Sequence, residues 1–337
     1  MAKLALITGA SGQDGYYLID LLRTHGYAVH AQSRRPGAPD RQGDGVHWHI
    51  GNPTDTKFLE RLILGLAPDE IYNLASISRP TQSWNVPRET AEVNALVPAQ
   101  ICELLVTHLP RCRLFQATSS EIFDNSLPLC QNEQTQCMPK TPYGIAKLYA
   151  HRIVGAYRER FGLYACSGIM FNHESPRRPL EYVSQKIAYA AAAIALGMTE
   201  TPAREEGGRP IVSDGKLYLG DLGVKRDFGF AGDYVEAMHM LLQHSTPDDY
   251  VIGTGQSHSI QEFCEIAFRA VGCNWTEHVQ IDPELFRKID NRYTCADTTK
   301  LRNVFGWAAK TSFEQLVTQM VSAQIRALGG DDSVYAV

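Results

Sequence analysis

The chain has 337 residues, of which 44% are hydrophobic and 20% are charged, and its formal net charge is −5. These values are typical of a soluble globular protein with a large core, and they argue against a nucleic-acid partner; the most apolar stretch, residues 187–196, is too short to cross a membrane. The eight cysteines are scattered and no signal peptide precedes the first apolar run, so we expect mostly reduced cysteines, no metal site and a cytoplasmic protein.

The first predicted elements are a buried strand over residues 4–8, a glycine-rich turn over 9–15 (GASGQDG) and a helix over 16–22. The turn has the spacing Gly-x-x-Gly-x-x-Gly. Such glycines permit a tight turn and let the backbone approach a pyrophosphate, which then sits at the helix N-terminus. The pattern predicts a dinucleotide site, and a plain turn is the alternative.

The second predicted strand, residues 27–33, is followed by Arg34 and Arg35. A protein that selects NAD usually carries an acidic residue here, which binds the ribose 2′-hydroxyl. Arginine binds a phosphate group instead, so the pair favours NADP over NAD. The alternative is that both arginines are ordinary solvated charges of a loop.

Strands and helices continue to alternate as far as about residue 172. Further strands are predicted over 46–50, 70–74, 114–117 and 164–171, with helices over 54–64 and 89–107 and a third that carries Tyr143. This rhythm predicts an α/β fold with a Rossmann-like, doubly wound parallel sheet. We expect an NADP-binding domain over residues 1–171, to which segments near 217–255 return, and a smaller C-terminal lobe that binds the substrate, mainly over 172–337.

Polar motifs follow two of these strands and also lie on the third helix. Residues 118–121 (TSSE) and 172–174 (NHE) come at strand ends, where parallel sheets bind ligands. Tyr143 and Lys147 are four residues apart and share a helix face. We expect the ammonium to lower the pKa of the phenol, which could then remove a proton from a sugar hydroxyl. Taken alone, the pair would more often be an exposed helix face, and it indicates catalysis only together with an upstream dinucleotide site.

Together these motifs resemble the extended short-chain dehydrogenase/reductase family of nucleotide-sugar enzymes and, within it, the GDP-mannose 4,6-dehydratases. The shared strings run nearly from end to end, and the most discriminating is Asn-His-Glu-Ser-Pro-Arg-Arg at 172–178. They cover residues 7–15, 68–75, 142–149, 168–178 and 226–236.

The resemblance implies a catalytic set formed by Ser119, Glu121, Tyr143 and Lys147, with serine where the family usually has threonine. It implies NADP-dependent dehydration of a GDP-hexose to a GDP-4-keto-6-deoxy-hexose by internal hydride transfer, and GDP-mannose is the substrate that it favours. Glu121 would remove the proton on carbon 5 and help to expel the 6-hydroxyl as water.

The motifs and the resemblance also imply two sets of binding residues. The cofactor set is Gly9, Gly12, Gln13, Asp14, Gly15, Arg34, Arg35, Asn52, Leu74, Ala75, Tyr143, Lys147 and His173. The substrate set is Ser83, Glu121, Asn172, Lys186, Leu219, Gly220, Arg226 and Arg287.

The chain departs from the family pattern at several positions. Asn52 stands in place of aspartate, and Arg79-Pro80 in place of His-Val near the sugar pocket. Residues 199–216 resemble an insertion whose charges and glycines suggest a solvated loop, with a segment that reshapes the sugar or base pocket as the alternative. Dehydration of a related GDP-sugar such as GDP-manno-heptose, reduction or epimerisation of a 4-keto sugar, and an inactive NADP-sensing protein therefore stay open. Because the loop at 36–45 is short, we expect a homodimer, with a tetramer as the alternative.

Overall fold

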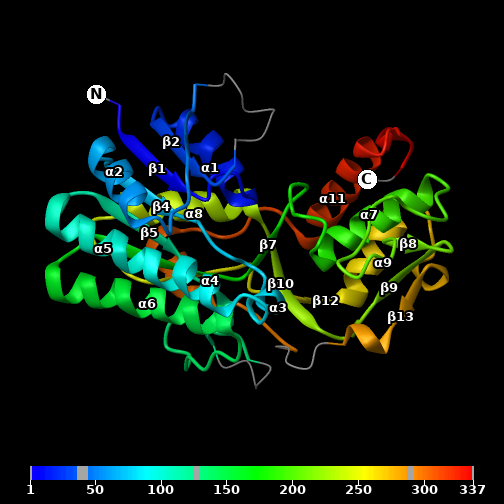
Figure 1. The fold of residues 1–337 in the computed structure, drawn as a ribbon. Helices are drawn as coiled ribbons and strands as arrows, with labels where there is room; N and C mark the ends of the chain where they lie inside the picture. Colours follow the sequence, from blue (N-terminus) through cyan, green and yellow to red (C-terminus); the bar gives the residue numbers. More distant parts are fainter. Residues whose placement is uncertain (1, 36–44, 124–128, 287–291, 336–337) are drawn as a thin grey trace.

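The computed structural model describes residues 2–35, 45–123, 129–286 and 292–335. Arg287 lies outside this part of the chain. Figure 1 shows two units side by side, a large sheet with helices on both faces and a smaller lobe that contains the C-terminal helix.

The larger unit is built around a seven-stranded sheet whose neighbouring strands are all parallel. Its strands, in spatial order, are β11 (Tyr250–Ile252), β6 (Ala165–Met170), β5 (Arg113–Ala117), β4 (Glu70–Asn73), β1 (Leu4–Thr8), β2 (Ala28–Ser33) and β3 (His47–Ile50). The order reverses between β1 and β4, so the loops that follow these two strands diverge and open a crevice. This is the predicted doubly wound, Rossmann-like sheet.

Helices cover both faces of this sheet. Helices α1 (Gln13–Thr24) and α8 (Ala231–Gln243) contribute Leu18 and Met238 to one buried cluster. On the other face, α2 (Thr56–Leu66), α5 (Val97–His108) and α6 (Pro142–Phe161) contribute Leu59, Ile101 and Val154 to a second cluster. The three layers bury apolar side chains on both sides of every central strand, as a parallel sheet requires.

The smaller lobe has two three-stranded sheets and its own core. Strand β10 (Lys225–Phe230) lies between β7 (Asn172–Glu174) and β12 (Ser257–Ser259), and β9 (Lys216–Leu219) lies between β8 (Val212–Ser213) and β13 (Val279–Ile281). The core lies between α7 (Val183–Ala195), α9 (Ile260–Ala270) and α11 (Phe313–Ala327). The remaining short elements are α3 (Pro80–Ser83), α4 (Pro87–Ala91), η2 (Glu92–Leu96), η3 (Ser120–Ile122), η4 (Trp275–Glu277), η5 (Pro283–Leu285), α10 (Thr299–Phe305) and η6 (Asp332–Val334).

The chain returns to the large sheet after entering the smaller lobe. Within the span near 217–255, α8 covers the large sheet and β11 pairs with β6, whereas β9 lies in the smaller lobe. Helix α10 then contributes Leu301 to the α1–α8 cluster. The division at residue 172 stays a prediction.

The helix predicted over 89–107 is interrupted by η2, one turn of π-helix. Pro98 has no N–H to donate to the carbonyl of Asn94, so the regular ladder cannot pass this point. The Asn94 side chain meanwhile accepts a hydrogen bond from the Ile77 N–H at 2.9 Å and donates one to the Ile77 carbonyl at 3.0 Å. This fixes the loop that follows β4, on the wall of the crevice.

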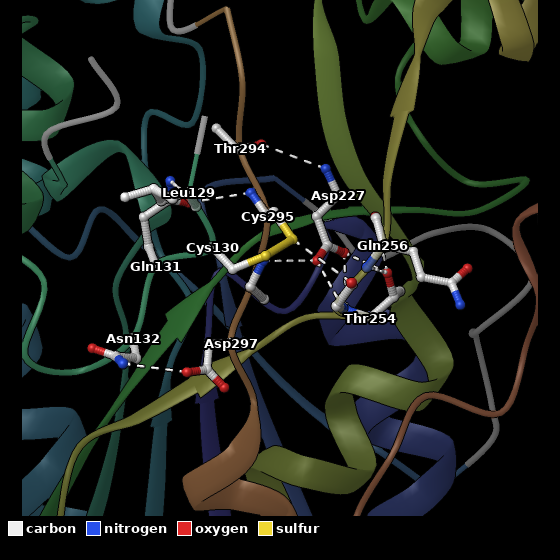
Figure 2. Close-up of a disulfide and its surroundings, with 12 residues drawn as sticks. Leu129, Cys130, Gln131, Asn132, Asp227, Thr254, Gln256, Thr294, Cys295 and Asp297 are labelled. Atoms are coloured by element: carbon white, nitrogen blue, oxygen red, sulfur yellow. Dashed lines mark hydrogen bonds between the residues drawn. A yellow bond between two sulfur atoms is a disulfide. The ribbon is translucent and has the colours of Figure 1, made fainter. Parts of the chain in front are cut away.

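A disulfide and a buried carboxylate connect the two units (Figure 2). Cys130 is bonded to Cys295, and the Gln131 N–H donates to the Cys295 carbonyl at 2.7 Å. Nearby, the Asp227 carboxylate accepts from the backbone N–H groups of Thr254 and Ala296 at 2.8 and 3.0 Å. The Cys130–Cys295 disulfide is an exception to the expectation of reduced cysteines. The other six described cysteines are free.

In the described part of the chain, no helix combines the length and the apolarity needed to cross a membrane. The same residues contain no group of three or more His, Cys, Asp or Glu side chains placed to hold a metal ion.

Candidate functional site

A cavity of about 930 Å³ opens where the two units meet, at the carboxyl ends of the central strands. Its walls come from the glycine turn after β1, the loops after β2, β4 and β5, the start of α6, strand β7 and parts of the smaller lobe. A site of this size at the switch point of a doubly wound sheet is the usual place for a dinucleotide and its substrate.

The glycine turn has the tight geometry that a bound pyrophosphate needs. Gly9 has φ +66°, and a Cβ on it would lie 2.7 Å from the Ala75 backbone. A Cβ on Gly15 would lie 2.3 Å from the Ala10 carbonyl oxygen. Because neither position accepts a side chain, the turn stays close to the sheet and the N-terminus of α1 faces the cavity, with its positive dipole end toward any phosphate.

Arg34 and Arg35 follow β2 and line the same cavity. The Arg34 guanidinium lies 3.4 Å from the Glu89 carboxylate, but both side chains are about half exposed, so this pair holds the arginine only weakly. The positions of the two arginines fit a 2′-phosphate at the end of the second strand.

Asp14 and His173 join the glycine turn to β7. The His173 Nε2 and the Asp14 carboxylate are 2.9 Å apart, and the other ring nitrogen is 2.8 Å from the Phe171 carbonyl. Burial alone would raise the pKa of Asp14, but the neighbouring His173 holds it below its ordinary value; burial alone would lower the pKa of His173, but Asp14 raises it. The Gln13 amide adds a bond of 3.0 Å to the His173 carbonyl, so these side chains fix the turn against the smaller lobe.

Helix α6 places Tyr143 and Lys147 inside the cavity. The helix begins after Thr141, whose hydroxyl caps the Gly144 N–H at 3.0 Å, and Pro142 occupies the first position, where no N–H is needed. The Lys147 ammonium donates to the Ala117 carbonyl at 2.9 Å and lies 5.8 Å from the centre of the Tyr143 ring.

The pKa values of this pair differ from the prediction. Burial raises the pKa of the Tyr143 phenol, although a hydrogen bond with the Ser119 side chain opposes this rise. Burial lowers the pKa of Lys147 to about 8, with Asp14 acting in the opposite direction. The lowering expected for Tyr143 from its spacing to Lys147 is therefore wrong for the chain as it stands, because both groups are buried and the ammonium is directed at a backbone carbonyl.

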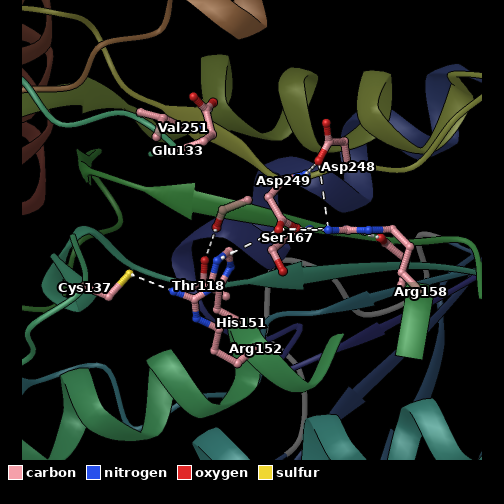
Figure 3. Close-up of polar contacts among 12 residues, drawn as sticks. Thr118, Glu133, Cys137, His151, Arg152, Arg158, Ser167, Asp248, Asp249 and Val251 are labelled. Atoms are coloured by element: carbon pink, nitrogen blue, oxygen red, sulfur yellow. Dashed lines mark hydrogen bonds and ion pairs between the residues drawn. The ribbon is translucent and has the colours of Figure 1, made fainter. Parts of the chain in front are cut away.

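Ser119 caps the short turn η3, which follows β5 after two residues, and Glu121 lies within that turn. The Ser119 hydroxyl accepts from the Glu121 N–H at 3.2 Å, and Glu121 is half-buried in the cavity wall. A Cβ on Gly144 would lie 2.5 Å from the Glu121 carbonyl oxygen, so η3 rests directly on α6 at the residue that follows Tyr143. Thr118 does not replace Ser119, because its hydroxyl donates to the Gly168 carbonyl at 3.0 Å; Figure 3 shows Thr118 with its neighbours.

Most of the predicted site residues line this one cavity. They are Gly9, Gly12, Gln13, Asp14, Gly15, Arg34, Arg35, Leu74, Ala75, Ser119, Glu121, Tyr143, Lys147, Asn172, His173, Lys186, Leu219, Gly220 and Arg226. Two of the others are placed differently. The exposed Asn52 caps its own turn by accepting from the Thr54 N–H at 3.2 Å, and the buried Ser83 accepts from the Tyr143 N–H at 3.2 Å, a position that supports the helix rather than the cavity wall.

Several wall residues were not among the predicted set. They are Arg79, Arg178, Tyr182, Glu205, Glu206 and Tyr218. Three of them had a signal in the sequence: Glu205 and Glu206 are adjacent charges within the insertion, and Arg79 is one of the departures from the family pattern. Of the two interpretations of the insertion, a solvated loop or a segment that reshapes the pocket, the structure favours the second, because it brings the tip to the cavity.

The fold and the cavity together define an enzyme of the extended short-chain dehydrogenase/reductase class. The family model for GDP-mannose 4,6 dehydratase matches residues 6–320. GDP-mannose 4,6 dehydratase 1 of Arabidopsis thaliana is 38% identical over 96% of this chain and 90% of its own length, and GDP-mannose 4,6-dehydratase of Sinorhizobium fredii is 36% identical over 97% and 98%. The chain therefore belongs to the GDP-mannose 4,6-dehydratase family.

A solved structure shows the same fold at a greater distance in sequence. UDP-glucose 4-epimerase of Thermotoga maritima superposes with a TM-score of 0.83 at 19% identity, over 96% of this chain and 99% of that protein. At this identity the likeness is informative about the architecture alone.

Proposed function

We propose that the protein catalyses the NADP-dependent dehydration of GDP-mannose to a GDP-4-keto-6-deoxy-hexose. Membership of the family supports this function. The structural observation that carries it is the contact between η3 and α6, which sets the half-buried Glu121 carboxylate in the same cavity wall as Tyr143. Oxidation of a hydroxyl group, or reduction of a ketone, needs the tyrosine and the lysine, whereas elimination of water needs a further acid–base group.

The residues present fit an NADP cofactor. The closed glycine turn provides the cradle for the pyrophosphate, and Arg34 and Arg35 stand where the 2′-phosphate would lie. When bound, NADP supplies the oxidant for carbon 4 of the sugar and then the reductant for carbon 6.

The side chains of the chain would handle the protons. We assign to Tyr143 the proton of the 4-hydroxyl. This role requires the phenol to lose its own proton first; burial raises the pKa of the phenol, and the hydrogen bond with Ser119 opposes that rise. Glu121 would take the proton from carbon 5, which the 4-ketone has made acidic, and return one to the departing 6-hydroxyl. Lys147 would hold the ribose side of the cofactor while its ammonium is charged, below a pH of about 8.

The substrate's diphosphate carries two negative charges, and the cavity offers cations on its far wall. Arg226 is buried at 7% exposure and Lys186 is also turned inward. Both belong to the smaller lobe, which supports our assignment of that lobe to the nucleotide sugar. Assembly as a homodimer and residence in the cytoplasm remain predictions.

The proposal is tested by incubating the purified protein with GDP-mannose and following the sugar by NMR. We expect a 4-keto-6-deoxy product without net consumption of NADP, and we expect Glu121→Gln to abolish product while Tyr143 and the fold stay intact. GDP-manno-heptose and UDP-, CDP- and dTDP-sugars complete the panel. Turnover of the heptose alone would replace the substrate, steady oxidation of NADPH by a keto sugar would indicate a reductase, and no product from any GDP-sugar would contradict the proposal.

A further inference from the structure

The insertion forms a hairpin whose tip carries two adjacent glutamates. Its strands are joined by hydrogen bonds from the Ile211 N–H to the Ala203 carbonyl at 3.0 Å and from the Glu205 N–H to the Arg209 carbonyl at 2.8 Å. Gly208, with φ +82°, completes the turn. Because Ile211 is buried at 2% exposure in the core of the smaller lobe, the base of the hairpin is anchored and its tip is held at the cavity.

Glu205 sits between two cations, one of which is a predicted substrate ligand. One carboxylate oxygen accepts from the Lys186 ammonium at 2.9 Å and the other from Arg209 at 3.2 Å. Arg209 is held in turn by Asp282 at 2.8 Å, with its guanidinium 4.7 Å from the centre of the Tyr218 ring. The side chain of Glu205 is only 11% exposed, so the pairing is shielded from water and the charge of Lys186 is compensated.

Glu206 reaches the opposite wall. Its carboxylate lies 2.6 Å from the Arg79 guanidinium, and this hydrogen bond lowers the pKa of Glu206, which keeps it ionised at neutral pH. Arg79 directly precedes α3, whose Ser83 supports the Tyr143 backbone. Two separate departures from the family pattern, the insertion and Arg79, therefore meet across the sugar end of the cavity.

We propose that Glu205 sets the affinity of this site for nucleotide diphosphates, because its carboxylate and the diphosphate of the nucleotide sugar compete for the same Lys186 ammonium. The inference rests on the proposed function, which assigns Lys186 to the diphosphate. The buried Ile211 at the base of the hairpin and the Arg209–Asp282 pair hold the tip in place, so the competition is present whenever the site is free. A diphosphate ligand can bind the Lys186 ammonium only by displacing Glu205, so the hairpin lowers the affinity of the site for every such ligand. NADP binds in a separate part of the cavity, and its affinity is unaffected.

The test is calorimetric titration of GDP into the NADP-loaded protein. We expect Glu205→Gln to bind GDP about tenfold more tightly, which corresponds to about 1.4 kcal/mol. The gain should vanish when Lys186→Met is added, and NADP affinity should not change. Glu200→Gln is the matched control, since it removes the same charge from the same insertion but from an exposed side chain that lies 4.0 Å from Arg204 and outside the cavity wall.

The opposite result has a clear meaning. If Glu205→Gln binds GDP as weakly as the unmodified protein, or more weakly, Glu205 serves only to position Lys186 and the inference is overturned. Glu205→Asp provides a second variant should the first fail to fold: its carboxylate is one methylene shorter and lies farther from the Lys186 ammonium, so it should also tighten GDP binding. Product formation by the unmodified protein is measured separately, so an inactive enzyme counts against the proposed function and an active one without the GDP effect counts only against this inference.

Discussion

Gly144 determines where Glu121 stands relative to Tyr143. The Glu121 carboxyl group belongs to η3 and the Tyr143 phenol to α6. The contact between these two elements leaves no room for a side chain at position 144. A methyl group there would lie 2.5 Å from the Glu121 carbonyl oxygen and 2.9 Å from Pro139 Cβ, so either η3 or α6 must move.

We therefore predict that Gly144→Ala lowers kcat by about a hundredfold, because a displacement on the order of 1 Å misaligns the proton transfer from carbon 5. NADP affinity should stay within about twofold. Gly155→Ala is the control on the same helix: its Cβ would meet only the Arg158 guanidinium at 3.8 Å, an ordinary contact, and it should raise helix stability by up to about 1 kcal/mol. A Gly144→Ala enzyme with unchanged kcat would show that η3 adapts freely.

At the scale of single residues, the sequence predicted which side chains meet better than it predicted their ionisation. The i, i+4 spacing brings Tyr143 and Lys147 to one helix face, since spacing is a property of the helix itself. The direction of the pKa shift of Tyr143 depends on burial and on where the Lys147 ammonium is directed, and no local pattern reports either. The cap formed by Asn52 depends on the local backbone in the same way, and its contact with the cofactor stays a prediction.

At the scale of elements, an ion pair fastens α6 to the segment that brings the chain back to the large sheet. Arg158 donates two hydrogen bonds of 2.9 Å to Asp249, which lies just before β11 and also accepts from the Ser167 N–H at 3.2 Å; Figure 3 shows this cluster. The side chains of Arg158 and Asp249 are 17% and 18% exposed. The pair thus connects α6, β6 and β11 away from bulk water.

We predict that Asp249→Asn lowers the free energy of unfolding by about 3–5 kcal/mol at pH 7, because it leaves a shielded guanidinium without its charge partner. Burial would raise the pKa of Asp249, but Arg158 and His151 hold it below the ordinary value. A carboxylate with a lowered folded pKa stabilises the fold above its unfolded pKa, near 4, and loses this contribution as the pH falls through the folded pKa.

The difference between the unmodified protein and Asp249→Asn, measured by urea unfolding, should therefore shrink below a pH of about 4. Asp248→Asn is the matched control, because Asp248 is 49% exposed and approaches Arg158 only to 4.0 Å. Its effect should stay below about 1 kcal/mol, as for other surface pairs. Equal losses from the two variants would mean that the burial of Asp249 contributes nothing.

The order of strands and helices in the first half was accessible from the sequence because each βαβ unit has its own apolar pattern. The break at η2 was missed although Pro98 is visible in the sequence; the bonds between Asn94 and the loop after β4 are tertiary, and no local pattern reports them. The hairpin at 203–211 escaped prediction for a related reason. Its charges are typical of a solvated loop, and only the positions of Lys186 and Arg79 in space reveal that they are paired.

At the scale of the whole molecule, the boundary between the two units is difficult to find in the sequence because the chain crosses it repeatedly. Helix α8, strand β11 and helix α10 return to the large sheet from the second half of the chain. The cavity lies where these crossings occur, and its walls therefore combine segments that are far apart in sequence. Local periodicity describes each segment but not the number of crossings.

The Cys130–Cys295 disulfide stabilises this arrangement by linking two such segments. It joins positions 165 residues apart, and the Gln131 carbonyl accepts from the Asp297 N–H at 2.8 Å beside it. A cross-link over so long a loop restricts the unfolded chain strongly, and constraints of this kind typically contribute about 2–4 kcal/mol. The segment that carries Cys295 also pairs with β10, where the Thr294 N–H donates to the Lys225 carbonyl at 3.2 Å next to Arg226.

We predict that the double variant Cys130→Ala/Cys295→Ala loses about 2–4 kcal/mol of unfolding free energy in urea under oxidising conditions. Dithiothreitol should lower the stability of the unmodified protein by a similar amount and leave the double variant unchanged. Cys102→Ala is the control for removal of a thiol, because Cys102 is free and buried; it should respond to dithiothreitol as the unmodified protein does. An unmodified protein that is insensitive to the reductant would show that the pair is held as two thiols, and the connection between the units would then rest on the hydrogen bonds around Gln131 and Asp227 alone.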